Sequence, residues 1–333
     1  MLRRLLLSII LFTVTACGAA APQSNEAPTS TPEASTSTPE APTATLPAPT
    51  STPAPSVRSI TDSAGRNVEI PVTIDAVISL APSTTEIVTA LNAQGNVQLL
   101  AVDVYSDYPP EIVDLPKITN YDMTVNYEQI TALQPDVVFA AGITAPDVVA
   151  QVTALGIPVI VVGSVDTTFA SILSDITLVG SVIGAEAEAT SVVEQMQRDW
   201  DALVAEVAMY PERPTVFWEL DATDPAKPYT IGPNNFVNDL LTAAGGVNIF
   251  ASADNPYPQV SVEQIVAADP DVILLADSIY GVTPEMVASR EGWQALAAVT
   301  NQRVYPINDS LVSRPGPRIV AGLAEVVAAL HPR

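Results

Sequence analysis

The chain has 333 residues, of which 48% are hydrophobic and 15% charged, and its formal net charge is −24 at pH 7. This acidity argues against nucleic acid and anionic lipid headgroups as partners, because both need a basic surface. One histidine, His331, and one cysteine, Cys17, leave no disulfide, no His- or Cys-based metal cage and no His-dependent catalytic triad. The composition therefore argues against an enzyme, and we expect neither a metal nor a cofactor.

The first residues indicate export. Residues 1–4 contain two arginines, and residues 5–16 form an apolar run that is too short to span a bilayer and is followed by Cys17. Small residues before a lone cysteine resemble a bacterial lipobox, which predicts that Cys17 is diacylated; the alternative is an ordinary signal peptide with a chance cysteine. We therefore expect residues 1–17 to be a lipoprotein signal peptide. Two acyl chains on Cys17 would anchor the protein stably to a membrane. The protein would then lie in the cell envelope, on the extracytoplasmic face of a membrane.

Residues 18–56 consist almost entirely of Ala, Pro, Thr, Ser and Glu. Such a segment cannot bury a core, so we predict a disordered chain with a polyproline II bias. At about 3.1 Å per residue it can extend on the order of 100 Å. We interpret it as a tether between the lipid anchor and the folded part of the protein.

From residue 57 onward, short apolar runs alternate with helical stretches. The runs AVISLAP, LLAVDV, DVVFAAG and PVIVVG are typical of buried parallel strands. The spacing of Ser83 and Glu86 predicts a capping box at the start of the helix after the first run. This alternation predicts a doubly wound α/β lobe over residues 57–165.

Residues 166–211 form a linking helical segment without strand signals. The stretch EAEATSVVEQMQRDWDALVAEVAMY predicts one amphipathic helix of roughly 24 residues, about 36 Å long. Gly180 and Gly184 just before it are expected to permit close helix packing.

Residues 212–333 resume the alternation, with strands in TVFWEL, DVILLA and VYPI and a closing helix in RIVAGLAEVVAALH. The fold class is therefore α/β, with two Rossmann-like lobes on parallel sheets joined by one long helix.

A repeat within the chain supports two similar lobes. EQITALQPDVV, which begins at Glu128, and EQIVAADPDVI, which begins at Glu263, agree at seven of eleven positions at an offset of 135 residues. Internal duplication accounts for this better than chance convergence. Asn126 and Ser261 precede the glutamates by two residues as candidate N-caps, so both acids would lie in a first helical turn. Charge–dipole attraction there contributes about 0.3–1 kcal/mol.

The order of several phrases resembles the helix-linked (class III) substrate-binding proteins of ABC importers for iron chelates and vitamin B12. The resemblance covers essentially the whole chain after residue 57, and YSDYPP and YPQVSVEQ are most similar to members that bind vitamin B12. It implies two rigid lobes, a helix that limits hinge closure and a ligand held in the cleft between the lobes. The phrases are RSITDSAGRNVEIP, VISLAPSTTEIVTAL, YSDYPPE, NYEQITALQPDVVFA, GPNNFVNDLLTAAGGVNIF, YPQVSVEQIVAADPDVI and RPGPRIVAGL.

The resemblance implies four ligand-binding tyrosines at positions where vitamin B12-binding members have cleft aromatics. They are Tyr105 and Tyr121 in the first lobe and Tyr229 and Tyr257 in the second. A corrin is a broad and mostly apolar plate, so rigid rings give a large contact area at small entropic cost. The alternative for each ring is that it caps a core or faces water.

Arg314 precedes Pro315-Gly316-Pro317, and the resemblance implies that it faces the cleft, where it pairs with a phosphate or chelate oxygen. The alternative is a surface arginine that supports the loop, and we expect Arg318 on the surface of the last helix. Several positions depart from the family, and at Tyr121, Tyr229 and Tyr257 a tyrosine replaces an expected phenylalanine or tryptophan. Ala141 replaces an expected tryptophan, and Ser310 replaces an expected acid, although Asp309 is adjacent. These departures leave a corrinoid precursor, a siderophore or heme open as cargo.

The resemblance also implies that Glu128 and Glu263 dock onto arginines of a membrane permease; the alternative is a charge–dipole role alone.

We therefore expect a monomeric, lipid-anchored solute-binding protein that delivers cobalamin or a related corrinoid to an ABC importer. Its alternative cargo is a ferric siderophore or heme. An enzyme would have to use Glu219, Asp221 and Asp224, which we expect in a solvated loop. The duplicated lobes disfavour a purely structural lipoprotein.

Overall fold

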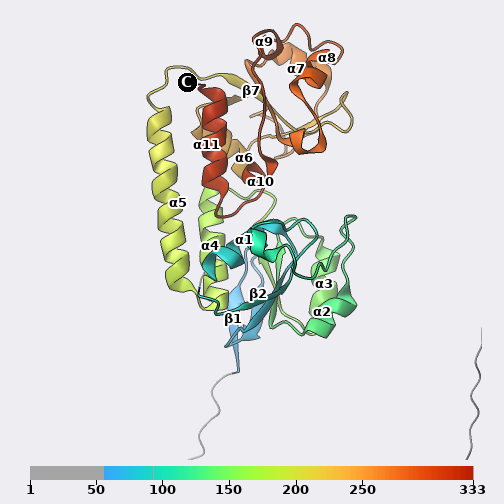
Figure 1. Ribbon diagram of the computed structural model, residues 1–333, viewed down its shortest axis with the longest axis vertical. Coiled ribbons are helices and arrows are strands. Elements are labelled where there is room, and N and C mark those ends of the chain that lie inside the picture. The colour runs from blue at the N-terminus through green and yellow to red at the C-terminus, as the bar shows by residue number, and fades with distance from the viewer. Residues whose placement is uncertain (1–55, 93, 333) are drawn as a thin grey trace, which may run out of the picture. The chain divides into compact units, whose positions relative to one another are not determined.

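The computed structural model describes residues 56–92 and 94–332 (Figure 1). The chain divides into two units, and Ala54–Arg333 is the compact unit that contains these residues. The expected signal peptide and the lipidation site at Cys17 lie outside the described residues, and so does nearly all of the expected tether.

The first lobe is built on a four-stranded parallel sheet with the order β4-β3-β5-β6. Its strands coincide with the four apolar runs, and every residue of β5 and β6 is buried. An antiparallel hairpin, β1-β2, precedes the sheet. The elements are β1 (Val57–Thr61), β2 (Asn67–Pro71), β3 (Ala76–Ser79), α1 (Pro82–Leu91), β4 (Gln98–Ala101), η1 (Pro110–Ile112), α2 (Tyr127–Leu133), β5 (Val137–Ala141), α3 (Pro146–Ala154) and β6 (Val159–Val162).

The second lobe carries a five-stranded sheet with the order β11-β10-β7-β8 and with β9 also paired to β7. All pairs are parallel except β7 with β8. The elements are β7 (Thr215–Asp221), β8 (Tyr229–Thr230), α6 (Phe236–Ala243), β9 (Val247–Asn248), α7 (Val262–Ala268), β10 (Val272–Leu275), η2 (Ala276–Tyr280), α8 (Pro284–Ser289), α9 (Ala297–Thr300), β11 (Val304–Pro306), α10 (Asp309–Val312) and α11 (Ile319–Leu330).

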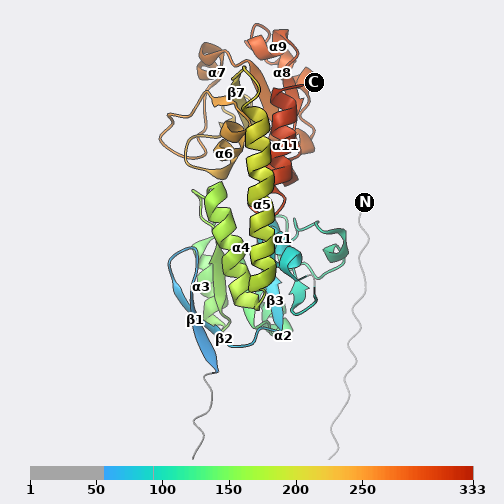
Figure 2. The same ribbon diagram turned by 90° about the vertical axis from the view of Figure 1, so that its left-hand side faces the viewer.

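Two helices link the lobes, α4 (Phe169–Ile183) and α5 (Glu186–Val207). The long helix predicted from the sequence is α5, which packs on α1 and α4 and also on α6 and α11 (Figure 2). Gly184, at φ 70°, ends α4 in the left-handed conformation that glycine adopts at no steric cost. A Cβ on Gly180 would lie 2.5 Å from Cβ of Ala189. The expected close packing at Gly180 is therefore confirmed.

The repeated sequence folds into the same unit in each lobe. The side chains of Asn126 and Ser261 cap α2 and α7 as predicted. Both helices end on a residue with positive φ and lead through a Pro-Asp pair into β5 and β10. The Asp of each pair then fixes a neighbouring strand, because Asp136 accepts the backbone N–H of Ala76 and Asp271 that of Thr215. The repeat thus encodes a local capping and strand-pairing device.

The start of α1 differs from the predicted capping box. Its N-cap is Ala81, which makes no side-chain capping bond, and proline occupies the first turn. Because Pro82 has no N–H to cap and its φ already suits a helix, the start lies before Ser83. Glu86 is therefore free of a capping role, and its carboxylate binds arginines of the second lobe instead.

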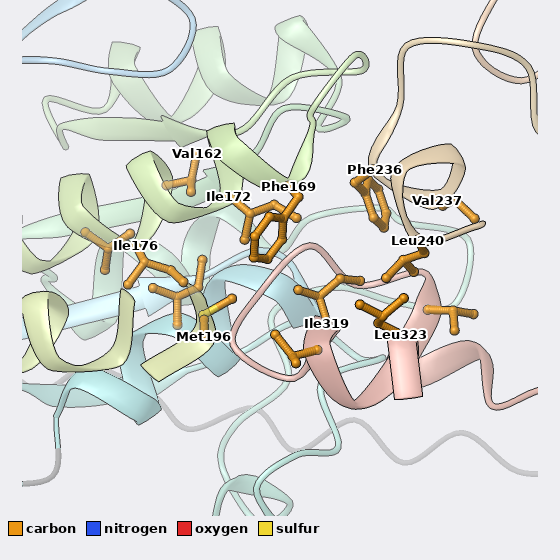
Figure 3. Close-up of a cluster of buried hydrophobic side chains, with 14 of the residues drawn as sticks. Val162, Phe169, Ile172, Ile176, Met196, Phe236, Val237, Leu240, Ile319 and Leu323 are labelled. Atoms are coloured by element: carbon orange, nitrogen blue, oxygen red, sulfur yellow. The ribbon is translucent and has the colours of Figure 1, made fainter. Parts of the chain in front are cut away.

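One hydrophobic cluster includes residues of both lobes and of both linking helices (Figure 3). Val77 and Val137 of the first sheet belong to it together with Val216 and Leu274 of the second. The lobes thus share a continuous core. Figure 3 labels Val162, Phe169, Ile172, Ile176, Met196, Phe236, Val237, Leu240, Ile319 and Leu323 of this cluster.

Candidate functional site

Three of the five expected ligand residues lie near strand ends. Tyr105 follows β4, and Tyr229 pairs with Asp221 at the last position of β7. Tyr257 lies next to β8, because the backbone N–H of Thr230 donates to the carbonyl of Pro258 at 3.0 Å. In α/β folds this edge of the sheet is the usual ligand-binding edge.

Two of the four tyrosines contact each other in the first lobe. The rings of Tyr105 and Tyr121 meet edge to face, with centroids 5.8 Å apart and an interplanar angle of 77°. The Tyr105 hydroxyl donates to the Tyr121 carbonyl at 2.8 Å. Tyr121 remains 77% exposed and Tyr105 42%. The pair therefore presents ring surface that a flat apolar ligand can cover.

The tyrosines of the second lobe differ in burial. Tyr229 is 46% exposed. Tyr257 is half-buried, and desolvation raises the pKa of its hydroxyl to about 12. Tyr257 is therefore a neutral hydrogen-bond donor at physiological pH. Among the described residues, no ring contact joins these two tyrosines to Tyr105 or Tyr121.

Four further apolar side chains near strand ends were missed by the sequence analysis. Ile143 follows β5 and is 79% exposed, and Val165 follows β6 and is 58% exposed. Ile279 and Tyr280, in η2 directly after β10, are 62% and 80% exposed. The available signal was an apolar residue placed a few positions after a predicted strand, where solvent-facing residues are usually polar. These side chains add exposed apolar surface near the strand ends of both lobes.

Arg314 and Arg318 of the second lobe converge on Glu86 of the first. Arg314 Nη1 lies 3.0 Å from Glu86 Oε1, and Arg318 binds the same carboxylate through Nε and Nη2 at 2.8 and 2.5 Å. The Arg318 guanidinium also stacks on Tyr108, with Cζ 3.9 Å from the ring centroid. The expectation that Arg318 lies on the helix surface is therefore wrong, because a carboxylate and a ring from the other lobe bind it.

Arg314 also pairs with Asp107, at 2.6 Å from Nη1 to Oδ1. Burial opposes ionisation of Asp107, yet the hydrogen bond and the charge of Arg314 outweigh it and lower the pKa of that carboxyl. Burial likewise opposes the charge of Arg314, but Asp107 and Glu86 raise the pKa of the guanidinium. Asp107 and Arg314 are therefore both charged at neutral pH.

Glu219 and Asp277 form a buried acidic pair at the ends of β7 and β10. Glu219 is fully buried and accepts two hydrogen bonds from Arg290, including Nη2 to Oε1 at 2.8 Å. Burial and the charge of Glu219 raise the pKa of Asp277 to about 6. The expected solvated loop is wrong for Glu219, whereas Asp221 and Asp224 are exposed. Glu219 is thus buried in an ion pair with Arg290, so Glu219, Asp221 and Asp224 do not form the single solvated cluster expected from the sequence.

The two candidate docking acids are exposed in equivalent places. Glu128 lies in the first turn of α2, and Glu263 in the first turn of α7. A hydrogen bond to Ser261 lowers the pKa of the Glu263 carboxyl. Both glutamates therefore present a carboxylate to solvent at corresponding positions of the two lobes.

Two α/β lobes joined by helices, with exposed apolar side chains near their strand ends, have the architecture of a two-lobed solute-binding protein. The chain belongs to the periplasmic binding protein family, whose model matches residues 77–311. It is 32% identical over 280 residues to the uncharacterized ABC transporter substrate-binding lipoprotein YvrC of Bacillus subtilis, covering 82% of this chain and 85% of that protein. These findings confirm the resemblance inferred from the sequence.

A second relative is the vitamin B12-binding protein of Vibrio cholerae, 31% identical over 268 residues, covering 78% of this chain and 90% of that protein. The crystal structure of the vitamin B12-binding protein BtuF of Vibrio cholerae has a TM-score of 0.64 and 29% identity, covering 77% of this chain and 96% of that one. The family is extracytoplasmic and serves transport, so this chain is a substrate-binding protein of an ABC transporter and not an enzyme. Between residues 56 and 332, apart from 93, no helix is both long and apolar enough to cross a bilayer.

Proposed function

We propose that this protein captures cobalamin or a related corrinoid in the cleft between its lobes and delivers it to an ABC importer permease. The observation that carries the proposal is the exposed aromatic and aliphatic surface near the strand ends of both lobes. A corrin offers two broad faces, which rings from opposite lobes can cover. The relative from Vibrio cholerae, whose name states vitamin B12 binding, supports the same cargo.

Each candidate residue has a distinct part in this proposal. Tyr105 and Tyr121 cover one face of the ligand, and Tyr229 and Tyr257 cover the other. Arg314 binds an anionic group at the edge of the ligand, since a guanidinium pairs well with phosphate oxygens. The absence of catalysis in the family agrees with a site made of rings and one arginine.

Delivery requires attachment to the membrane and recognition of the permease. Lipidation of Cys17 anchors the protein outside the cytoplasm, and residues 18–56 tether the folded unit. Glu128 and Glu263 dock onto two equivalent permease subunits, which two equivalent acids of a monomer can reach together. The lipoprotein designation of the relative from Bacillus subtilis supports the anchor.

The cargo is tested by calorimetric titration of the full chain with cyanocobalamin, a panel of ferric siderophores and hemin. Submicromolar one-to-one binding of cyanocobalamin is expected. Heat from an iron chelate or hemin and none from cyanocobalamin would overturn the choice of cargo and keep the transport role. Binding of none of these ligands would contradict both cargo classes.

Heme is the second candidate, because Tyr121 and Tyr229 carry exposed phenol groups that can ligate ferric iron. A tricatecholate siderophore is less well matched. It needs several unneutralised cations, whereas Arg314 and Arg318 are both paired with carboxylates of the chain. A visible spectrum with a tyrosinate-ligated ferric band would identify heme.

A further inference from the structure

The carboxylate of Asp107, in the first lobe, pairs with Arg314, the arginine that is proposed to bind the ligand. Its Oδ1 lies 2.6 Å from Arg314 Nη1, which also donates to Glu86 Oε1 at 3.0 Å. Arg314 Nη2 donates to the carbonyl of Tyr105 at 3.4 Å. A ligand therefore meets Arg314 with both terminal nitrogens already engaged.

The two carboxylates on Arg314 differ in how firmly they are held. The Glu86 side chain is 2% exposed and also accepts two hydrogen bonds from Arg318. The Asp107 side chain is 60% exposed, and Arg314 is the only side chain among the described residues to which its carboxylate is hydrogen-bonded. Because a solvated carboxylate loses little when it returns to water, an incoming anion can displace Asp107 but not Glu86.

The charges of this cluster already balance. The two guanidinium groups of Arg314 and Arg318 face the two carboxylates of Glu86 and Asp107, so the net charge is zero. An anionic group that enters therefore finds no surplus cation. It gains a favourable partner only by replacing the more exposed acid.

We propose that Asp107 is an internal competitor for the oxyanion of the ligand. Its carboxylate holds Arg314 until a ligand phosphate or carboxylate displaces it, and it thereby sets the selectivity between ligands with and without such a group. The competitor comes from the loop that also carries Tyr105, so displacement removes one of the contacts between this loop and the second lobe as the ligand binds. The stacking of Arg318 on Tyr108 and the hydrogen bond from Arg314 to the Tyr105 carbonyl are separate contacts of the same loop. This inference rests on the proposed binding of a ligand oxyanion by Arg314 and, for the choice of corrinoid probes, on the proposed cargo.

The test uses Asp107→Asn, which keeps the shape and an acceptor oxygen but removes the charge. Its matched control is Asp114→Asn, which removes the same charge from the same connection between β4 and α2. Asp114 is exposed and has no hydrogen bond or ion pair among the described residues. The full chain and both variants are titrated with cyanocobalamin and with dicyanocobinamide, which lacks the nucleotide loop and its phosphodiester.

Asp107→Asn is expected to bind cyanocobalamin about fivefold more tightly, as removal of a competing, partly exposed ion pair allows. Its affinity for dicyanocobinamide should stay within about twofold of the wild type, and Asp114→Asn should match the wild type for both. No gain with cyanocobalamin would overturn the inference. So would an equal gain with both corrinoids or with Asp114→Asn.

A second measurement uses inorganic phosphate as the probe and needs no corrinoid. Phosphate at tens of millimolar should raise the thermal midpoint of Asp107→Asn by about 1–2 °C more than that of the wild type or of Asp114→Asn, with chloride at equal ionic strength as reference. Equal shifts in all three proteins overturn the inference. If no corrinoid binds the wild type, the proposed cargo is wrong and this measurement alone decides the role of Asp107.

Discussion

Asp239 of α6 accepts a hydrogen bond from the backbone N–H of Phe169 at 2.9 Å, and Phe169 is the first residue of α4. A carboxylate from the second lobe thus stabilises the N-terminus of a helix that packs on the first. Asp239→Ala should lower the free energy of unfolding by about 1 kcal/mol, measured by urea denaturation. Asp147→Ala, an exposed acid in the first turn of α3, is the control and should change stability by less than half as much. Equal losses would show that no specific bond operates.

Glu86→Ala should lower the free energy of unfolding far more than Asp239→Ala, because it leaves Arg314 and Arg318 partly buried without their shared acceptor. The expected loss in the free energy of unfolding is about 3–5 kcal/mol, as for other broken buried pairs. Urea is the suitable denaturant, since it does not screen charge. A loss below about 1 kcal/mol would mean that the cluster acts like an exposed salt bridge.

The raised pKa of Asp277 predicts that the free energy of unfolding depends on pH. Its pKa is raised from 3.8 to about 6 in the folded protein, where the side chain is 3% exposed. The folded state therefore holds the proton more tightly, and the contribution of Asp277 to stability decreases as pH rises from about 4 to 6. Asp277→Asn should then be more stable than the wild type by about 1–3 kcal/mol at pH 7.5 and nearly equal to it at pH 4. Urea denaturation at both pH values checks this, and a constant difference would contradict it.

The proposed coverage of both ligand faces by tyrosine rings predicts the effect of removing single tyrosines. Tyr105→Ala and Tyr257→Ala should each weaken cyanocobalamin binding at least tenfold, about 1.4 kcal/mol, with folding preserved in circular dichroism. Tyr105→Phe removes only the hydrogen bond to the Tyr121 carbonyl and should change affinity less. Unchanged affinity in both alanine variants would remove these rings from the site.

The docking acids predict a loss of transport without a loss of ligand binding. Glu128→Lys combined with Glu263→Lys should abolish uptake of radiolabelled cargo in cells, because two cations would oppose the arginines of the permease. Glu186→Lys, in the first turn of α5, has the same unfavourable helix-dipole effect and should transport normally. Normal uptake by the double variant would contradict docking.

Local patterns in the sequence predict much of this fold. The strands of the first sheet and β7, β10 and β11 of the second coincide with predicted apolar runs, whereas the two-residue strands β8 and β9 were not predicted. The N-caps Asn126 and Ser261 follow from the residue types that cap helices. The capping box at Ser83 was wrong because Pro82 satisfies the helix start without a side-chain cap. Periodicity and capping rules therefore work where the interacting residues are near in sequence.

The site was less predictable because its decisive contacts are distant in sequence. Glu86 and Arg318 are 232 residues apart, and no local pattern indicates that they pair. The prediction of a solvated loop at Glu219 was wrong because Arg290, which binds this carboxylate, lies 71 residues further on. Family resemblance indicated the tyrosines, whereas the exposed Ile143 and Tyr280 were missed although each lies a few positions after a predicted strand.

The core that crosses from one lobe to the other bears on how the protein melts. Two similar halves with separate cores would unfold in two steps, each with its own enthalpy. Here Val137 and Leu274, one from each sheet, belong to a single cluster, so loss of either lobe exposes apolar surface of the other. The duplicated chain should behave in calorimetry as one cooperative unit, with the van't Hoff and calorimetric enthalpies equal.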